Sequence, residues 1–365
     1  MAEQALPGFP GGPGEPNPPG RGPQGPGPGG RAEYGRAEGG LPHPGGTAVV
    51  PGGRWRSAGV WLARRVGSAV FVLWAVATLI FLAIRLIPGD PAEAIMGGPG
   101  SQASAEALQA ARLEYGLDEP LGVQYLSQLG RLATGDLGTS YALKVPVAQL
   151  LGDQLPGTLA LAAGAWVLAW VLALGLALWS GLGGRGAAVV GSALEIAAAS
   201  VPHFWLGSVL VLLFSTAWGW LPPVSNGTAA GLIMPIVTLA LPLAGFLGQV
   251  MRESMLAAMT SPFALSARAR GETEAGVVLR HALRHAALPG VALSGWALGS
   301  LVSGAVVVES IFARPGLGRS LLQAVTLRDL PLVTGVALVS ALAYVVVMAL
   351  SDLAERAIDP RMRQR

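Results

Sequence analysis

The sequence lacks several residue types on which common classes of protein depend. Cysteine is absent from the 365 residues, which excludes disulfides, thiol catalysis and thiolate metal sites. Lysine occurs once, as Lys144 between Leu143 and Val145, so the chain has no Gly-Lys-Ser/Thr phosphate loop. Charged residues make up only 12% of the chain, about half the usual share of a soluble domain, whereas 52% are hydrophobic. These scarcities favour a membrane protein that does not hydrolyse ATP through such a loop.

Glycine and proline are abundant, and many of them lie at the N-terminus. Residues 1–53 contain 17 glycines and 12 prolines, with few large apolar side chains. Such a segment buries too little surface to offset its ordering entropy, so we expect residues 1–55 to be a disordered cytoplasmic tail. It is not a signal peptide, because the first apolar run begins beyond residue 60.

Six apolar segments predict six membrane spans. The first has 19 uncharged residues, which as a helix extend about 28 Å, close to the thickness of a bilayer core. The 56 uncharged residues between Glu195 and Arg252 are too many for one helix, and Leu221–Gly227 supplies a turn within them. The predicted spans are Val66–Ile84, Gln154–Gly184, Val189–Ala217, Ala229–Met251, Ala286–Val308 and Leu330–Ser351.

The distribution of arginine and lysine predicts the orientation. With the N-terminus in the cytoplasm, 17 basic residues fall on the inner side and seven on the outer side. Both termini are therefore expected in the cytoplasm. The predicted segments are a first transmembrane helix, an extracytoplasmic loop, a core of five spans that contains an inner loop, and a cytoplasmic tail: 56–87, 88–153, 154–355 with inner loop 252–288, and 356–365.

The outer loop opens with Pro88, Gly89, Asp90 and Pro91. Two prolines in four residues end the first helix, and Gly89 permits a sharp turn. A helix is expected to follow, with Ser104 or Ser101 as its N-cap. The loop is either a solvated cap on the bundle or a docking surface for an external delivery protein.

The inner loop predicts a helix that could bind a soluble partner. Ser261 followed by Pro262 has the chemistry of an N-cap and a first helical position, and Gly271 is expected to end this short helix. A second helix is predicted from Glu272 toward Leu288, with Pro289 at the entry to the fifth span. A short helix held between two spans can insert into a groove of a partner.

This loop resembles the EAA loop of binding-protein-dependent ABC importer permeases, in particular the peptide permease branch. Further local patterns agree with that branch in order between residues 88 and 361. They are Pro88–Pro91, Gly135–Ser140, Ser200–Gly207, Gly219–Pro222, Arg252–Leu256, Ala267–Gly271, Arg280–Arg284, Leu288–Pro289, Glu309–Phe312, Pro315–Gly318, Arg328–Pro331 and Asp359–Arg361.

The resemblance implies a type I importer fold of about six transmembrane helices in a bacterial plasma membrane. It implies that the loop couples to a cytoplasmic ATPase through Phe263, Ser266, Ala267, Arg268, Ala269, Arg270, Gly271 and Glu272. It assigns loop and turn motifs to Pro88, Gly89, Asp90, Pro91, Pro315, Gly316 and Gly318. Leu265, Ser266, Glu272 and His285 depart from the common EAA pattern, which could adjust the fit to a particular ATPase.

The same resemblance implies the partners and the role. They are a second related permease chain, two ATPase subunits that use ATP and magnesium, an extracytoplasmic solute-binding protein and the bilayer, with no nucleic acid. The chain itself is expected to be non-catalytic, to bind no cofactor and to translocate di- or oligopeptides. The alternatives are the same machinery importing nickel chelates or another non-peptide solute and, less favoured, a stand-alone secondary transporter.

Several polar residues could indicate a metal site or ion coupling, but the residues around them do not favour either function. His281 and His285 have the spacing of a helical metal pair, but no third ligand is evident and arginines flank both. No metal site is predicted. Glu195, Glu309 and Asp352 lie near the ends of spans, where we expect capping and packing roles rather than ion coupling.

Overall fold

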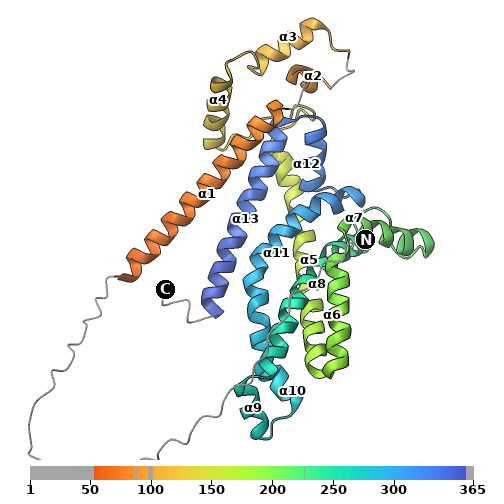
Figure 1. Ribbon diagram of the computed structural model, residues 1–365. Coiled ribbons are helices and arrows are strands. Elements are labelled where there is room, and N and C mark those ends of the chain that lie inside the picture. Colours follow the sequence, from red (N-terminus) through yellow and green to blue (C-terminus); the bar gives the residue numbers. More distant parts are fainter. Residues whose placement is uncertain (1–52, 87–88, 98–101, 226, 359–365) are drawn as a thin grey trace, which may run out of the picture. The chain divides into compact units, whose positions relative to one another are not determined.

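The computed structural model describes residues 53–86, 89–97, 102–225 and 227–358 (Figure 1). The chain divides into two units, Met1–Gly53 and Arg54–Arg365, and the second contains the long apolar helices. Among the described residues there are helices and no strand, apart from an isolated bridge between Thr139 and Pro146. The predicted all-α fold is confirmed. The predicted tails fall outside the described residues at positions 1–52 and 359–365.

The helices are α1 (Gly53–Leu86), α2 (Pro91–Ile95), α3 (Ala105–Glu114), α4 (Leu121–Ala133), α5 (Val147–Leu182), α6 (Gly184–Ser200), α7 (His203–Leu210), the π-helical η1 (Val211–Ala217), α8 (Ala230–Met259), α9 (Pro262–Ala269), α10 (Glu274–Gly276), the π-helical η2 (Val277–Ala282), α11 (Leu283–Ile311), α12 (Leu317–Thr326) and α13 (Leu330–Ile358).

Five stretches in the described part are long and apolar enough to cross a membrane as single helices. They are Ala63–Leu86, Val147–Leu182, Ala230–Met259, Glu274–Ile311 and Leu330–Leu353. The predicted third span is instead broken, because Gly184–Ser200 and His203–Ala217 meet at a 99° bend. Pro202 stands at the bend as the N-cap of α7, where it cannot continue the preceding helix. Six spans result if the bent pair counts as one.

A stripe of alanine on α5 lies at the centre of the bundle. Ala165, Ala169, Ala173 and Ala177 are fully buried and recur every four residues, so they share one face of the helix. They cluster with apolar residues of α8 and α11. In a membrane, small side chains at such a face allow helices to approach closely and gain van der Waals contact.

Glycine has the same effect where α11 meets its neighbours. A Cβ atom on Gly299 would lie 2.5 Å from the Tyr344 ring of α13, and one on Gly304 would lie 2.8 Å from Leu239 of α8. Both distances are too short for a side chain. Gly175 of α5 differs, because a Cβ there would have no atom within 4 Å.

The fifth span begins earlier than the position of Pro289 predicts. Helix runs from Glu274 through η2 into α11 and ends at Ile311, with Pro289 inside it. The loop before this span is therefore short, and it is joined rigidly to the span that follows.

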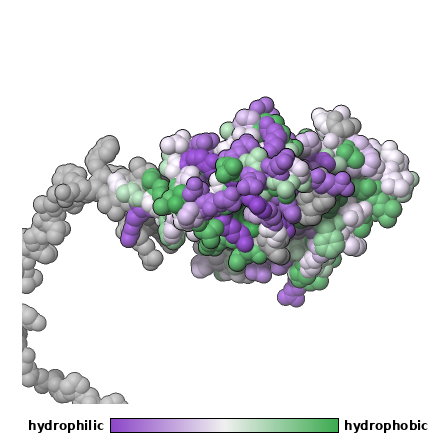
Figure 2. All heavy atoms as spheres, turned by 90° about the horizontal axis from the view of Figure 1, so that it is seen from above, coloured by the Kyte–Doolittle hydropathy of each residue, from purple (hydrophilic) through white to green (hydrophobic). Residues whose placement is uncertain are grey.

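The two ends of α5 define two ends of the bundle. Gly157 lies beside Arg314 at one end, and Gly181 lies beside Met255 at the other. We call the first the cap end, which carries α2, α3 and α4, and the second the loop end, which carries α9 and α10. Figure 1 shows these short helices at opposite ends of the long ones. Figure 2 looks onto the cap end, where hydrophilic residues gather.

Candidate functional site

Helix α9 at the loop end begins and ends where the sequence predicts. The Ser261 hydroxyl accepts a hydrogen bond from the Ala264 N–H at 3.5 Å, and Pro262 occupies the first helical turn. Gly271 follows the C-cap with φ +86°, a conformation that favours glycine. The Glu272 N–H then donates to the Ala267 carbonyl at 3.2 Å, which closes the helix end.

One side of α9 is buried and the other is exposed. Ala264 and Ala267 pack against Val277 of η2 and are fully buried, so Ala267 holds the helix in place and does not face a partner. Phe263, Ser266, Ala269, Arg270 and Gly271 are exposed. Leu265 is 58% exposed and stands between them, although the sequence marked it only as a departure from the EAA pattern. An apolar side chain on such a surface is the signal that sequence reasoning missed.

Arg268 fixes α9 to the elements on both sides of it. Its Nε and Nη2 atoms donate to the two carboxylate oxygens of Glu274 at 2.7 and 2.9 Å. Its Nη1 atom donates to the Met259 carbonyl at the end of α8, at 2.8 Å. This paired geometry uses the planar fork of arginine, which lysine cannot reproduce.

Glu272 and the two histidines complete the loop. The Glu272 carboxylate contacts His281 Nε2 at 2.9 Å, and this hydrogen bond is the main reason why the pKa of Glu272 lies below its usual range. His285 instead stacks on Phe263, with ring centroids 4.8 Å apart. The two histidines therefore have separate partners. No group of three or more potential metal ligands occurs among the described residues.

The first predicted turn motif lies at the cap end. Pro88 falls outside the described residues. Gly89 has φ +127°, and a Cβ atom there would overlap Arg328. Asp90 caps α2 by accepting from the Ala92 N–H at 2.9 Å and pairs with Arg112 at 2.5 Å, while Pro91 opens the helix.

The second turn motif surrounds a buried carboxylate. Glu309 at the end of α11 accepts from the Thr158 hydroxyl at 2.6 Å and from the Gly318 and Arg319 N–H groups at 2.8 and 3.2 Å. It thereby caps α12. A Cβ atom on Gly316 would lie 2.1 Å from this carboxylate, so only glycine fits there. The predicted capping role of Glu309 is confirmed; its partner on α5 was not predicted.

Pro315 and Arg314 place this turn against α5. The Arg314 guanidinium donates to the Gly157 carbonyl and the Ser225 hydroxyl, both at 3.1 Å. A Cβ atom on Gly157 would lie 3.5 Å from the Pro315 carbonyl. The turn is thus tied to the helix that crosses the whole bundle.

A second buried carboxylate, Asp329, joins the cap to α13. It accepts from the Ser140 hydroxyl, from the Ala142 N–H at 3.1 Å and from the Leu332 N–H at 3.2 Å. Near the loop end, Glu195 of α6 pairs with Arg252 of α8 at 2.7 Å. Sequence patterns contained all these acids but did not indicate which distant residues they meet.

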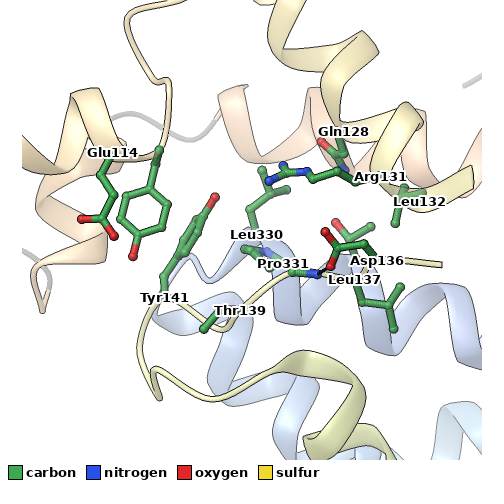
Figure 3. Close-up of a pocket in the computed structure, with 13 residues that line it drawn as sticks. Glu114, Gln128, Arg131, Leu132, Asp136, Leu137, Thr139, Tyr141, Leu330 and Pro331 are labelled. Atoms are coloured by element: carbon green, nitrogen blue, oxygen red, sulfur yellow. Dashed lines mark hydrogen bonds between the residues drawn. The ribbon is translucent and has the colours of Figure 1, made fainter. Parts of the chain in front are cut away.

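A polar cavity of about 350 Å³ lies at the cap end, between α3, α4 and the start of α13 (Figure 3). Glu114, Tyr115, Arg131 and Tyr141 are among the residues that line it. The rings of Tyr115 and Tyr141 meet edge to face, 4.9 Å apart. Burial raises the pKa of Tyr141 from its ordinary value of 10.0 to about 12, which makes ionisation of a hydroxyl already protonated at neutral pH still less favourable.

Two family models match the chain. The model for the binding-protein-dependent transport system inner membrane component matches residues 171–364, and the model for the N-terminal part of such membrane components matches residues 60–162.

Relatives share nearly their full length with this chain. A putative peptide transport system permease protein of Brucella abortus is 36% identical over 316 residues, covering 82% of this chain and 98% of its own. The glutathione transport system permease protein GsiC of Salmonella typhimurium is 33% identical over 309 residues, covering 84% and 99%. A chain of the MetNI methionine ABC transporter in an inward-facing conformation aligns with a TM-score of 0.48 and 18% identity, over 58% of this chain and 97% of that one.

Proposed function

Because this chain belongs to the family of inner membrane components of binding-protein-dependent transport systems, we propose that it is the permease subunit of an ATP-driven importer of short peptides. The observation that carries the proposal is helix α9, which displays Phe263 and Leu265 on a rigid base. A partner that binds this exposed face can transmit force into α8 and α11. Arg268 links α9 to the end of α8, and the helix from η2 into α11 is continuous.

The energy comes from other chains. The sequence has no P-loop lysine, so we expect ATP and magnesium to bind to a pair of cytoplasmic ATPase subunits and not to such a loop in this chain. A second related permease chain completes the membrane pathway, and an extracytoplasmic solute-binding protein delivers the solute. The names of the relatives support peptides as the solute: one is named a putative peptide transport system permease protein and the other a permease for glutathione, itself a small peptide. Nickel or another non-peptide solute has no such support.

The distribution of arginine supports a cytoplasmic loop end and an outer cap end. The absence of cysteine makes this testable with single cysteines in an unaltered background. In intact cells, a membrane-impermeant maleimide should label Ala105→Cys at the cap end, and it should label Ser266→Cys on α9 only after the membrane is opened. Labelling in the reverse pattern would invert the topology.

Leu265→Asp tests the docking face without disturbing the inside of the loop. A charge on this exposed position should prevent burial of the leucine in a partner groove, because desolvating an unpaired carboxylate is costly. Copurification of the ATPase and peptide-dependent ATP hydrolysis should both fall. Leu126→Asp is the matched control, since Leu126 is 68% exposed on α4 at the cap end and should leave both unchanged. Normal coupling in Leu265→Asp would refute the assignment of α9.

A further inference from the structure

The cavity at the cap end holds charged groups that have no partner within the described part of the chain. Neither the Arg131 guanidinium nor the Glu114 carboxylate forms a hydrogen bond or ion pair there, whereas Asp90 and Arg112 nearby pair with each other. Tyr141 likewise forms no hydrogen bond through its hydroxyl among those residues, and this hydroxyl is available as a donor. Arg131 and Glu114 are exposed and therefore hydrated in the free protein, so the ligand site is indicated by the combination of a concave polar cavity, charges of both signs and a half-buried tyrosine hydroxyl.

Glu114 and Arg131 are separated across the cavity, and the Asp136 carboxylate lies on the same side of Tyr141 as Arg131. Figure 3 shows the guanidinium of Arg131 directed toward Tyr141, while Glu114 lies on the other side of Tyr141. A simple anion would be repelled by Glu114 and Asp136, and a simple cation by Arg131. A zwitterion satisfies both, with a carboxylate between the Arg131 and Tyr141 donors and an ammonium group near Glu114.

The size and walls of the cavity narrow the ligand further. A volume of about 350 Å³ is at the lower end for small-molecule sites and suits a few residues rather than a folded domain. The paired tyrosine rings and Leu330 offer apolar and aromatic surface without selecting one side chain. Two neighbouring cavities share Tyr141 with this one, and Arg85 at the end of α1 and Gln124 line both of them.

We propose that this cavity is a receiving site for the free ends of a short peptide on the permease itself, with Arg131 and Tyr141 binding the terminal carboxylate and Glu114 binding the terminal ammonium. The inference rests on the proposed function for its substrate class. The inference adds to the proposed function a recognition site that lies outside the membrane core and is separate from the delivery protein. This site selects for the free termini of a peptide and not for its side chains.

The test measures binding of radiolabelled dialanine to the assembled importer in nanodiscs, without the solute-binding protein. Arg131→Gln should weaken binding by about tenfold, the effect of losing one charge-assisted contact, and Tyr141→Phe by a smaller factor. Dialanine amide, which lacks the carboxylate, should bind wild type and Arg131→Gln equally weakly. Acetylated dialanine should show the same relation with Glu114→Gln. Glu106→Gln, an exposed change on the same helix as Glu114, should have no effect.

Absence of saturable dialanine binding would overturn the proposal, as would an Arg131→Gln effect that persists with the amide. A lower affinity of the variants for the solute-binding protein, with no dialanine binding, would also overturn it, because a loop of that protein would then fill the cavity. The proposed function fails by a different result: no ATP-dependent dialanine uptake by the wild-type importer with its binding protein present. Uptake with normal kinetics in Arg131→Gln would overturn the receiving site while leaving that function intact.

Discussion

The loop end is held by contacts between residues that are close in sequence, whereas the cap end is held by contacts between residues that are far apart in sequence. At the loop end, Arg268 meets Glu274 six positions away and Glu272 meets His281 nine positions away. At the cap end, Glu309 meets Thr158 across 151 positions, and Asp329 meets Ser140 across 189. Both ends rely on carboxylates, but Glu272 and Glu274 of the α9–η2 loop are partly or largely exposed, whereas Glu309 and Asp329 of the cap end are fully buried.

This difference suits two mechanical tasks. Contacts between near neighbours shape the loop as a unit that can move as a whole without breaking its own hydrogen bonds. Buried contacts between distant segments fix how α5, α11, α12 and α13 meet, so they hold the cap in one arrangement. We therefore expect variants at the cap end to lower stability and variants at the loop end to change coupling.

The largest expected effect is that of Glu309→Gln. The amide nitrogen would face N–H groups that now donate to the carboxylate, and buried donors would lose their acceptor. We expect a loss of about 3 kcal/mol in the free energy of unfolding, measured by tryptophan fluorescence of the purified protein in denaturant. Asp352→Asn is the control, since Asp352 forms a partly exposed pair with Arg65 and should cost about 1 kcal/mol or less. Equal effects of the two variants would remove the distinction between buried and exposed carboxylates.

Asp329→Asn should rank second, at about 2 kcal/mol by the same measurement, because the asparagine oxygen keeps part of the acceptor capacity that Ser140, Ala142 and Leu332 use. Asp136→Asn is a matched control on the exposed side of the cap, where, among the described residues, the carboxylate accepts one hydrogen bond, from the Gly138 N–H at 2.9 Å. A larger loss of unfolding free energy in Asp136→Asn than in Asp329→Asn would contradict the expectation that buried carboxylates contribute most to stability.

The same contrast decides what the sequence could predict. The Ser261 cap, the Gly271 end of α9 and the capping role of Glu309 follow from residues within about one helical turn or one short loop, so local patterns predict them. The pairing of Glu309 with Thr158 depends on how helices pack, which a single sequence does not contain. The bend at Pro202 is intermediate: proline marks a possible break, but the angle depends on tertiary packing.

The third prediction concerns coupling. Glu274 is largely exposed, so Arg268→Gln and Glu274→Gln should change the unfolding free energy far less than Glu309→Gln. Both should reduce peptide-stimulated ATP hydrolysis, by up to about fivefold, because the ion pair between Arg268 and Glu274 no longer fixes the position of α9. In a double-mutant cycle the combined variant should be no worse than Arg268→Gln alone. Additive losses would mean that the two side chains contact the ATPase separately instead of each other.

The smallest expected effect is a pH dependence of the loop end. The pKa of Glu272 is lowered from its ordinary value of 4.5, mainly by the hydrogen bond with His281, so its ionised form favours the folded loop. This stabilisation is present above the unfolded pKa and is lost as the pH falls through the folded one. The hydrogen-exchange rate of residues 262–282, corrected for intrinsic rates, should therefore rise modestly below about pH 4.5. Between pH 6 and 8 the titration of Glu272 should leave this corrected rate unchanged. Glu272→Gln should exchange faster at neutral pH and lose the slope, whereas Glu106→Gln should retain it. A slope that survives in Glu272→Gln would assign the acid sensitivity to another group.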